Sequence, residues 1–430
     1  MASRVFLRQR GHNRKVIMAP RNPTGAYRRG KPQKNRRNSS KSQGASDRCL
    51  AQSIMFSLFQ QTILGMNLST LGRVLRRHRG PLYWRYLPRL AVLLGLAAFN
   101  SYMSRFEEAM NGEKIAAAEP VAPPIFILGF WRSGTTHLHN LLSLDPAFTC
   151  PTAYQVMFPH HFVYSQPWGV RLFDYFSPGK RPMDNVAFYG DTPHEEEMAL
   201  AALTGVSPYL RILFPVSAQE AYCAVDPSRL APEALAEWQA AFRHFVKKLS
   251  FSKGKRIVLK SPPHLGRIPI LLQMFPGAKF IHITRNPYAV YHSFQKNWRR
   301  GHALSHLQKP DPLAIDELIL SWYTDLFALC ERDRRLIPSS DFHELRFEDL
   351  EKSPRDCLAG LYQALALPVF ERFWPRAAVY LESLAGYKKS TYILTEAVRA
   401  KVSRRWRFFF ERHGYPLLPP LAPGETVSLG

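Results

Sequence analysis

The sequence predicts an α/β fold in which helices flank a parallel sheet on both faces. Three short, continuous apolar runs indicate strands buried on both faces, at Pro124–Gly129, Arg256–Leu259 and Lys279–Ile283. Helical patterns alternate with these runs. One amphipathic helix is predicted at Pro232–Leu249 and another helix at Leu265–Met274. Strands that alternate with helices in this way are typical of a parallel sheet covered on both sides.

The positive charge of the chain is concentrated at its N-terminus. The 430 residues carry a net charge of +25, and residues 1–48, with 14 Lys and Arg against one acid, account for +13 of it. We predict a disordered basic tail there, which is either solvated, a targeting peptide or a tether to an anionic surface. The remaining residues are only moderately basic, which argues against a nucleic-acid partner. Five widely spaced cysteines without a CxxC pair favour a reducing, cytoplasmic compartment, and no metal site is expected.

Residues 49–123 are predicted to form a helical extension and a linker into the main domain, residues 124–420. The most apolar run of the extension, Leu90–Phe99, has ten residues, whereas a membrane-spanning helix needs about 20. Aromatic and arginine side chains surround this run, as in a helix that lies on a membrane surface. A helix packed against the main domain explains the same run equally well. Peripheral membrane association and burial are therefore both open.

A glycine-containing loop follows the first predicted strand and opens an apolar helix over residues 136–144. In that position, the backbone N–H groups of the loop gather at a helix N-terminus, where the helix dipole favours a bound anion. The loop is P-loop-like, but a threonine stands where nucleotide triphosphatases have the lysine that reaches the β- and γ-phosphates. It therefore predicts a cradle for a smaller anion, or, structurally, only a tight turn. Its sequence is Gly129-Phe-Trp-Arg132-Ser133-Gly134-Thr135-Thr136.

This loop resembles the 5′-phosphosulfate loop of sulfotransferases, which use 3′-phosphoadenosine 5′-phosphosulfate as sulfuryl donor. Phe280–Pro287 followed by Ser293 is similar to the 3′-phosphate motif of that family. The segment Lys260-Ser-Pro-Pro-His264 resembles the lysine loop of its broad, mostly bacterial group, and Arg346–Leu350 resembles a common strand-to-helix segment there. The resemblance covers roughly residues 124–415. It implies a P-loop NTPase-like parallel sheet flanked by helices, here with a helical N-terminal extension.

The resemblance also implies roles for individual residues. Arg132 with Ser133, Gly134, Thr135 and Thr136 would hold the 5′-phosphate. Arg285 and Ser293 would hold the 3′-phosphate, because a guanidinium group makes forked, permanently charged contacts with phosphate. Lys260 would donate to the bridging oxygen of the co-substrate. Family members close over the nucleotide with a basic C-terminal segment, for which the candidates here are Lys389, Arg404 and Arg405.

Two candidates compete for the general base. His264 is one candidate, because the reference pKa of a histidine lies near neutrality and suits that role. Glu195 or Glu197 is the other candidate, because clustered carboxylates beside an anionic co-substrate can raise one another's pKa. However, Thr192 followed by Pro193 and three acids also predicts a helix start, with Thr192 as the N-cap.

The predicted function is transfer of a sulfuryl group from 3′-phosphoadenosine 5′-phosphosulfate to a hydroxyl or amine, which leaves adenosine 3′,5′-bisphosphate. The acceptor is expected to be a small molecule, a lipid or a carbohydrate. Ten aromatic residues within positions 150–190 suit either the wall of an acceptor pocket or ordinary core. Two alternatives are a P-loop nucleotide kinase, which Thr135 disfavours, and a basic membrane- or RNA-tethering protein with a vestigial loop.

Overall fold

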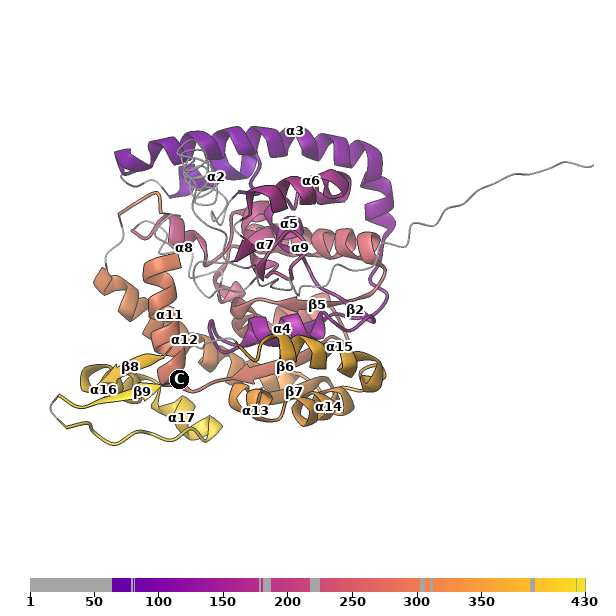
Figure 1. The fold of residues 1–430 in the computed structure, drawn as a ribbon. Coiled ribbons are helices and arrows are strands. Elements are labelled where there is room, and N and C mark those ends of the chain that lie inside the picture. Colours follow the sequence, from indigo (N-terminus) through magenta and orange to yellow (C-terminus); the bar gives the residue numbers. More distant parts are fainter. Residues whose placement is uncertain are drawn as a thin grey trace, which may run out of the picture.

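Five parallel strands form the central sheet of the protein (Figure 1). The computed structural model describes residues 64–78, 80, 82–177, 179–180, 187–216, 225–301, 306–309, 312–386, 391–422 and 424–429, so the predicted tail over residues 1–48 lies outside the described residues. The sheet confirms the predicted fold class, and the three strands predicted from apolar runs form its centre. In spatial order the strands are β2 (Phe148–Thr149), β5 (Arg256–Lys260), β1 (Ile125–Leu128), β6 (Lys279–Thr284) and β7 (Phe342–Arg346).

The central strands are apolar on both sides because helices cover both faces of the sheet. Ile125 and Ile127 point into one hydrophobic core, whereas Phe126 and Leu128 point into the other. The first core lies under α4 (Thr135–Leu142), α14 (Pro354–Ala364) and α15 (Phe370–Ser383). The second core lies under α7 (Glu197–Thr204), α9 (Pro232–Lys253), α10 (Ile268–Met274), α11 (Pro287–Gly301) and α12 (Pro312–Asp333).

One predicted helix start is wrong. The helix expected to begin after Thr192 begins four residues later, at Glu197. Residues 192–194 instead lie alongside residues 151–153: Pro193 bridges to Thr152, and the His194 N–H donates to the Pro151 carbonyl at 2.8 Å. This extended pairing satisfies backbone groups that the helix would otherwise use, so the acidic run forms a loop that enters α7.

The N-terminal extension is helical, in agreement with the sequence, and one of its faces packs on the main domain. It consists of α2 (Leu68–Arg77), the 3-10 turn η1 (Trp84–Tyr86) and α3 (Leu87–Ala117), which runs along one side of the molecule (Figure 1). α3 packs against α9 and α6 (Phe162–Phe176). Its inner face is anchored by a buried ion pair between Glu107 and Lys248 of α9. None of the described helices has the length and apolarity to cross a membrane.

The C-terminal segment packs against α11 and α12. Trp406 stacks on Tyr323 of α12, with ring centroids 3.7 Å apart. The segment contains β8 (Tyr392–Thr395), α16 (Glu396–Arg405), α17 (Arg407–His413) and β9 (Thr426–Leu429). The remaining elements are α5 (Ala153–Met157), β3 (Gly179–Lys180), β4 (Ala187–Phe188), α8 (Leu210–Leu213), η3 (Pro227–Arg229), η4 (Pro262–Gly266), η5 (Arg334–Leu336), η6 (Ser339–Asp341) and α13 (Phe347–Lys352).

Candidate active site

The predicted phosphate loop leaves the sheet at the carboxyl end of β1, and α4 begins directly after it at Thr135. Two glycines fit the loop into a tight space. A Cβ on Gly129 would lie 2.8 Å from the carbonyl oxygen of Ile283, and a Cβ on Gly134 would overlap the ring of Phe347. Gly134 also has a φ of +94°, a left-handed conformation that favours glycine. The loop therefore has the backbone that an anion-binding helix N-terminus requires.

Three of the predicted phosphate-binding residues meet at this loop. Arg132 is held with a φ of +71°, a strained conformation for a residue with a side chain. Its Nε donates to Ser293 Oγ of α11 at 2.9 Å, and its carbonyl accepts from Arg285 Nη1 at 3.1 Å. Two guanidinium groups and a hydroxyl thus converge at the carboxyl ends of β1 and β6. This donor set fits the phosphate groups of an anionic nucleotide.

Arg285 is positioned by the segment that resembles a strand-to-helix element. Its guanidinium lies over the ring of Phe347, 4.4 Å from the centroid, at the start of α13. Glu348 accepts a hydrogen bond from the backbone N–H of Asn286 at 2.9 Å and another from the Tyr415 hydroxyl at 2.9 Å. Glu348, in the first turn of α13, therefore holds the backbone next to Arg285.

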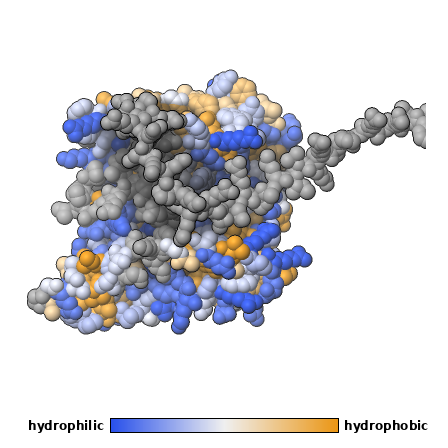
Figure 2. Space-filling view, viewed as in Figure 1, coloured by the Kyte–Doolittle hydropathy of each residue, from blue (hydrophilic) through white to orange (hydrophobic). Residues whose placement is uncertain are grey.

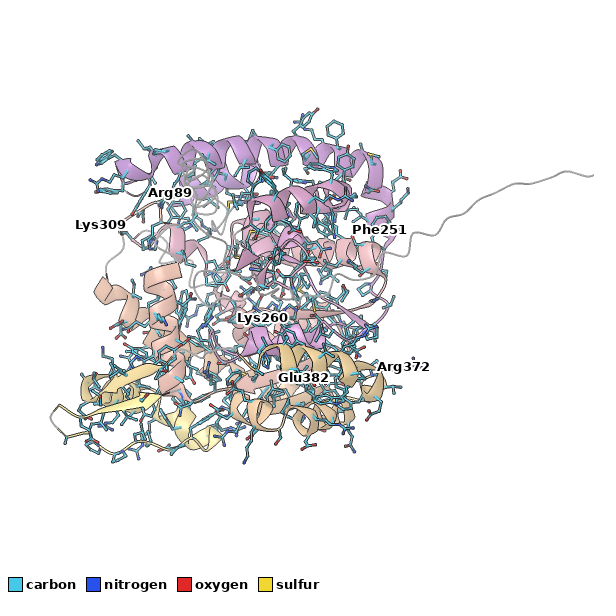
Figure 3. The ribbon with its side chains drawn as sticks, in the orientation of Figure 1. Arg89, Phe251, Lys260, Lys309, Arg372 and Glu382 are labelled. Carbon is cyan, nitrogen blue, oxygen red and sulfur yellow. The ribbon has the colours of Figure 1, made fainter. Side chains whose placement is uncertain are left out.

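Lys260 and Glu195 form a pair beside the phosphate loop. Lys260 ends β5 and lies in register with Ile127 of β1, two residues before the loop. Figure 3 shows it in the interior of the molecule, close to α4. Its Nζ lies 3.1 Å from Glu195 Oε1. The Lys260 side chain is 3% exposed and that of Glu195 is 17% exposed, so this pair reaches the surface from the Glu195 side.

The other two acids of the run are buried and have different partners. Glu196 accepts from the Lys260 backbone N–H at 2.9 Å and from His264 Nε2 at 2.6 Å. Glu197 accepts two hydrogen bonds from Arg267, at 2.5 and 3.1 Å. The side chains of His264, Glu196 and Glu197 are fully buried. Among the three predicted base candidates, Glu195 is the one that is partly exposed and next to Lys260.

Tyr209 and Trp131 complete this cluster; Trp131 belongs to the phosphate loop, whereas no sequence motif marks Tyr209. The Trp131 Nε1–H donates to the Tyr209 hydroxyl at 3.0 Å, and that hydroxyl donates to Glu195 Oε2 at 2.5 Å. Burial, together with the Glu195 carboxylate, raises the pKa of Tyr209 well above its usual value, so the phenol keeps its proton. The phosphate loop is thus connected to Glu195 through a side chain 78 positions away from Trp131.

The environment of Glu195 favours its ionised form. Burial raises the pKa of the carboxyl, but the nearby Lys260 and His194 and the hydrogen bond from Tyr209 lower it more. Its pKa therefore lies below the usual value of 4.5. A carboxylate with this pKa is ionised at neutral pH and can accept a proton.

The structure shows fewer contacts with the phosphate-binding residues for the cations that were predicted in the C-terminal segment. Lys389 lies outside the described residues. Arg404 is exposed on α16, and Arg405 Nη2 lies 2.7 Å from Glu317 Oε1 of α12. Because α16 packs on α11, which carries Ser293, a role in nucleotide binding stays a prediction for both arginines. Within the described residues, no group of three or more His, Cys, Asp or Glu could hold a metal ion.

Comparisons with known proteins identify the family. Residues 123–372 match the sulfotransferase family. Over 352 residues the chain is 36% identical to omega-hydroxy-beta-dihydromenaquinone-9 sulfotransferase Stf3 of Mycobacterium bovis, and equally to that of Mycobacterium tuberculosis; the match covers 82% of this chain and 90% of the relative. This family membership excludes the nucleotide-kinase and tethering alternatives.

Solved structures show the same fold. Sulfotransferase STF9 of Mycobacterium avium has a TM-score of 0.63 at 17% identity and covers 81% of this chain and 91% of its own. Sulfotransferase STF1 of Mycobacterium tuberculosis has a TM-score of 0.56 at 20% identity, and the match covers 79% of this chain and 91% of that structure's chain. The family match covers more than half of the chain, and a relative of known activity is 36% identical to it. The chain therefore belongs to the family of sulfotransferases that use 3′-phosphoadenosine 5′-phosphosulfate, and it is a sulfotransferase.

Proposed function

We propose that this enzyme sulfates a hydroxyl group on an apolar lipid, with Glu195 as the general base and Lys260 as the donor to the leaving oxygen. The observation that carries the assignment is the 3.1 Å pair of Lys260 and Glu195 beside the phosphate loop. The lipid acceptor is supported by the 36% identical relative, which is named for its action on a hydroxylated menaquinone. Cys150, Cys330 and Cys357 are unpaired, as suits the cytoplasmic side of a membrane.

The two phosphate groups of the co-substrate are assigned to different parts of the site. Arg132, the Ser133 side chain and the backbone N–H groups of Gly134, Thr135 and Thr136 would hold the 5′-phosphate at the N-terminus of α4, since the Ser133 N–H already donates to the Phe130 carbonyl at 3.1 Å. Arg285 and Ser293 would hold the 3′-phosphate. When bound, the co-substrate supplies the sulfuryl group. Lys260 then stabilises negative charge on the leaving oxygen, in a site where water is largely excluded.

Glu195 is the candidate that can take the proton of the acceptor hydroxyl. Its Oε2 is held by Tyr209, and its exposed side is open to an incoming group. His264 is fully buried and already bonded to Glu196, and Glu197 is held by Arg267, so neither is placed to meet an acceptor. The reaction needs the acceptor oxygen placed in line and its proton removed, and Glu195 supports both.

The function is tested by transfer of labelled sulfate from the co-substrate to a panel of acceptors. The panel contains a prenyl quinone hydroxylated on its prenyl chain, a water-soluble phenol and a hexose. The label is expected in the prenyl quinone, with a kcat/KM at least tenfold above that for the phenol, because a hydrophobic site gains affinity from apolar area. Label in the hexose alone would contradict the lipid acceptor while leaving the sulfotransferase assignment intact.

Arg285→Ala is expected to weaken binding of adenosine 3′,5′-bisphosphate by at least tenfold, because it removes a charge-assisted contact worth about 1.5–3 kcal/mol. Calorimetry on the purified variant measures this loss. Arg334→Ala is a matched control, since that guanidinium also lies over a ring, 5.6 Å from the Phe342 centroid, but at the start of β7 rather than at its end. Equal binding by the two variants would take Arg285 out of the nucleotide site.

The pH dependence of turnover distinguishes the two kinds of base. If Glu195 is the base, kcat/KM stays level as the pH falls from 8 and declines only below the usual Glu value of 4.5, because the folded-state pKa lies lower than that. Tyr209→Phe removes a donor to the ionised carboxylate, so its pKa rises and the acid limb moves to higher pH. A limb near pH 6.5 that Tyr209→Phe does not move would instead indicate a histidine base.

A further inference from the structure

Helix α3 exposes large apolar side chains on the face that turns away from the domain. Its inner face is already packed, at Leu93, Ala97, Asn100, Met103 and Glu107, with the spacing of one helical face. The outer side chains are therefore not needed for the core. In the space-filling view, hydrophobic residues gather along the upper edge of the molecule, over α3 (Figure 2). The exposed apolar residues of this region are Leu82, Trp84, Leu87, Val92, Leu94, Phe99, Tyr102, Phe106 and Met110.

A second apolar stripe lies on α6, which packs against α3. Trp168, Leu172 and Tyr175 are 45%, 53% and 72% exposed and follow one another at helical spacing. The rings of Tyr164 and Phe106 stack 6.1 Å apart and join the two helices. An apolar area of this extent is unusual on a water-facing surface and marks an interaction site. We call η1, the outer face of α3 and this stripe the α3 face.

The charge around the N-terminal part of the α3 face is positive. Residues 49–106 contain seven arginines and no Asp or Glu, whereas Glu108 and Glu113 are exposed farther along α3. Two of these arginines lie against aromatic rings at the start of α3: Arg85 is 5.4 Å from the Trp84 ring and Arg89 is 4.7 Å from the Tyr86 ring. Arg76, Arg85 and Arg105 are exposed. Aromatic residues interleaved with arginine are typical of the headgroup region of a membrane, where arginine meets anionic phosphates.

We propose that the α3 face docks this enzyme onto the surface of an anionic lipid bilayer. α3 would lie in the plane of the interface, since its inner side is fixed on α6 and α9 and no described helix can cross a bilayer. Through α2, which packs on α7, the extension also touches the element that follows Glu195. Docking places the acidic loop one layer of helices from the lipid. The residues that carry this inference lie outside the proposed catalytic site.

Flotation of the full chain with phosphatidylcholine vesicles, with and without phosphatidylglycerol, tests the docking. The variant Trp84→Ser/Leu87→Ser/Tyr102→Ser removes side chains that are 67%, 51% and 59% exposed. The matched control is Leu336→Ser/Val369→Ser/Val379→Ser, whose side chains are 58%, 59% and 57% exposed elsewhere on the surface. The wild type and the control are expected to float with the phosphatidylglycerol vesicles. The α3-face variant should lose at least about tenfold in the partition coefficient, because apolar burial drives interfacial binding.

Salt separates the α3 face from the basic tail. In about 1 M salt the Debye length falls to about 3 Å, so binding by charge alone is lost whereas apolar insertion persists. Binding that salt abolishes, and that is the same in the wild type and the α3-face variant, would assign attachment to residues 1–48 and overturn the proposal. The variant Arg85→Gln/Arg105→Gln is expected to lower the preference for phosphatidylglycerol without abolishing binding to it.

Two further readouts keep the result unambiguous. Binding of adenosine 3′,5′-bisphosphate should be the same in all variants, which shows that they are folded and keeps the test independent of sulfuryl transfer. Light scattering reports on a second copy as the occupant of the α3 face. A dimer that the α3-face variant converts to a monomer, with no vesicle binding by the wild type, would contradict docking on lipid.

Discussion

Lys260→Ala is expected to lower kcat/KM about 10³-fold, as is typical when a preorganised donor to developing charge is removed. The Lys260 ammonium is 3% exposed, and its Nζ faces the Glu195 carboxylate at 3.1 Å. In such a site a fixed positive charge stabilises a leaving oxygen far more than it does in water. Binding of adenosine 3′,5′-bisphosphate should change by less than about threefold, because Arg132, Arg285 and the helix N-terminus hold the phosphates.

Steady-state kinetics and calorimetry on the same preparation check this result. Lys279→Ala is a suitable control, because Lys279 begins β6 at the amino end of the parallel strands, whereas Lys260 ends β5 at their carboxyl end; the Lys279 Nζ lies 2.9 Å from Asp341 Oδ1. That variant should keep its kcat/KM. Normal turnover by Lys260→Ala would remove Lys260 from the mechanism, and a loss confined to nucleotide binding would make it a binding residue only.

Glu197→Ala is expected to lower the free energy of unfolding by about 3–5 kcal/mol, as is usual when one partner of a buried ion pair is removed. Arg267 is 1% exposed and donates hydrogen bonds to both carboxylate oxygens of Glu197. Ser207 Oγ also donates to Glu197 at 2.7 Å. The alanine variant leaves the guanidinium buried without its carboxylate. Urea denaturation measures the loss.

Glu237→Ala provides the comparison for a surface pair. Glu237 and Arg73 are bonded at 2.6 Å but are 44% and 41% exposed, so removal of this pair should cost less than about 1 kcal/mol. If Glu197→Ala is as stable as the wild type but inactive, Glu197 returns to the candidates for the base. In contrast, Glu195→Gln should fold normally and lose about 10²–10⁴-fold in turnover, as expected for a general base.

The sequence predicted the parts of the fold that local patterns encode. The three central strands are apolar on both faces and stand out as continuous runs, whereas β7 carries His343, Glu344 and Arg346 at the edge of the sheet and has no such run. β2 has two residues, too few for any period. Lys260 and Arg285 lie at strand ends, where a motif marks them directly.

Sequence patterns could not rank the three carboxylates of the acidic run. Which of them faces Lys260 depends on the pairing of Pro193 with Thr152, a contact between distant segments that no local period records. The same limit applies to Tyr209. Its role depends on a hydrogen bond to Trp131, which is far away in the chain. The chemistry of the site was therefore predictable from motifs, but its internal geometry required the fold.

The buried pair of Lys248 and Glu107 bears on where the folding unit of the enzyme begins. The segment that matches the sulfotransferase family is residues 123–372, yet this pair joins α9 to a helix that precedes residue 123. Detaching α3 would carry Glu107 into water and leave the Lys248 ammonium in the interior without its carboxylate, at a cost of about 3–5 kcal/mol, a large part of the stability of a typical domain. The extension and the catalytic domain are therefore expected to unfold in one cooperative transition, so that the folding unit includes α3 from Leu87 onward and does not begin at residue 123.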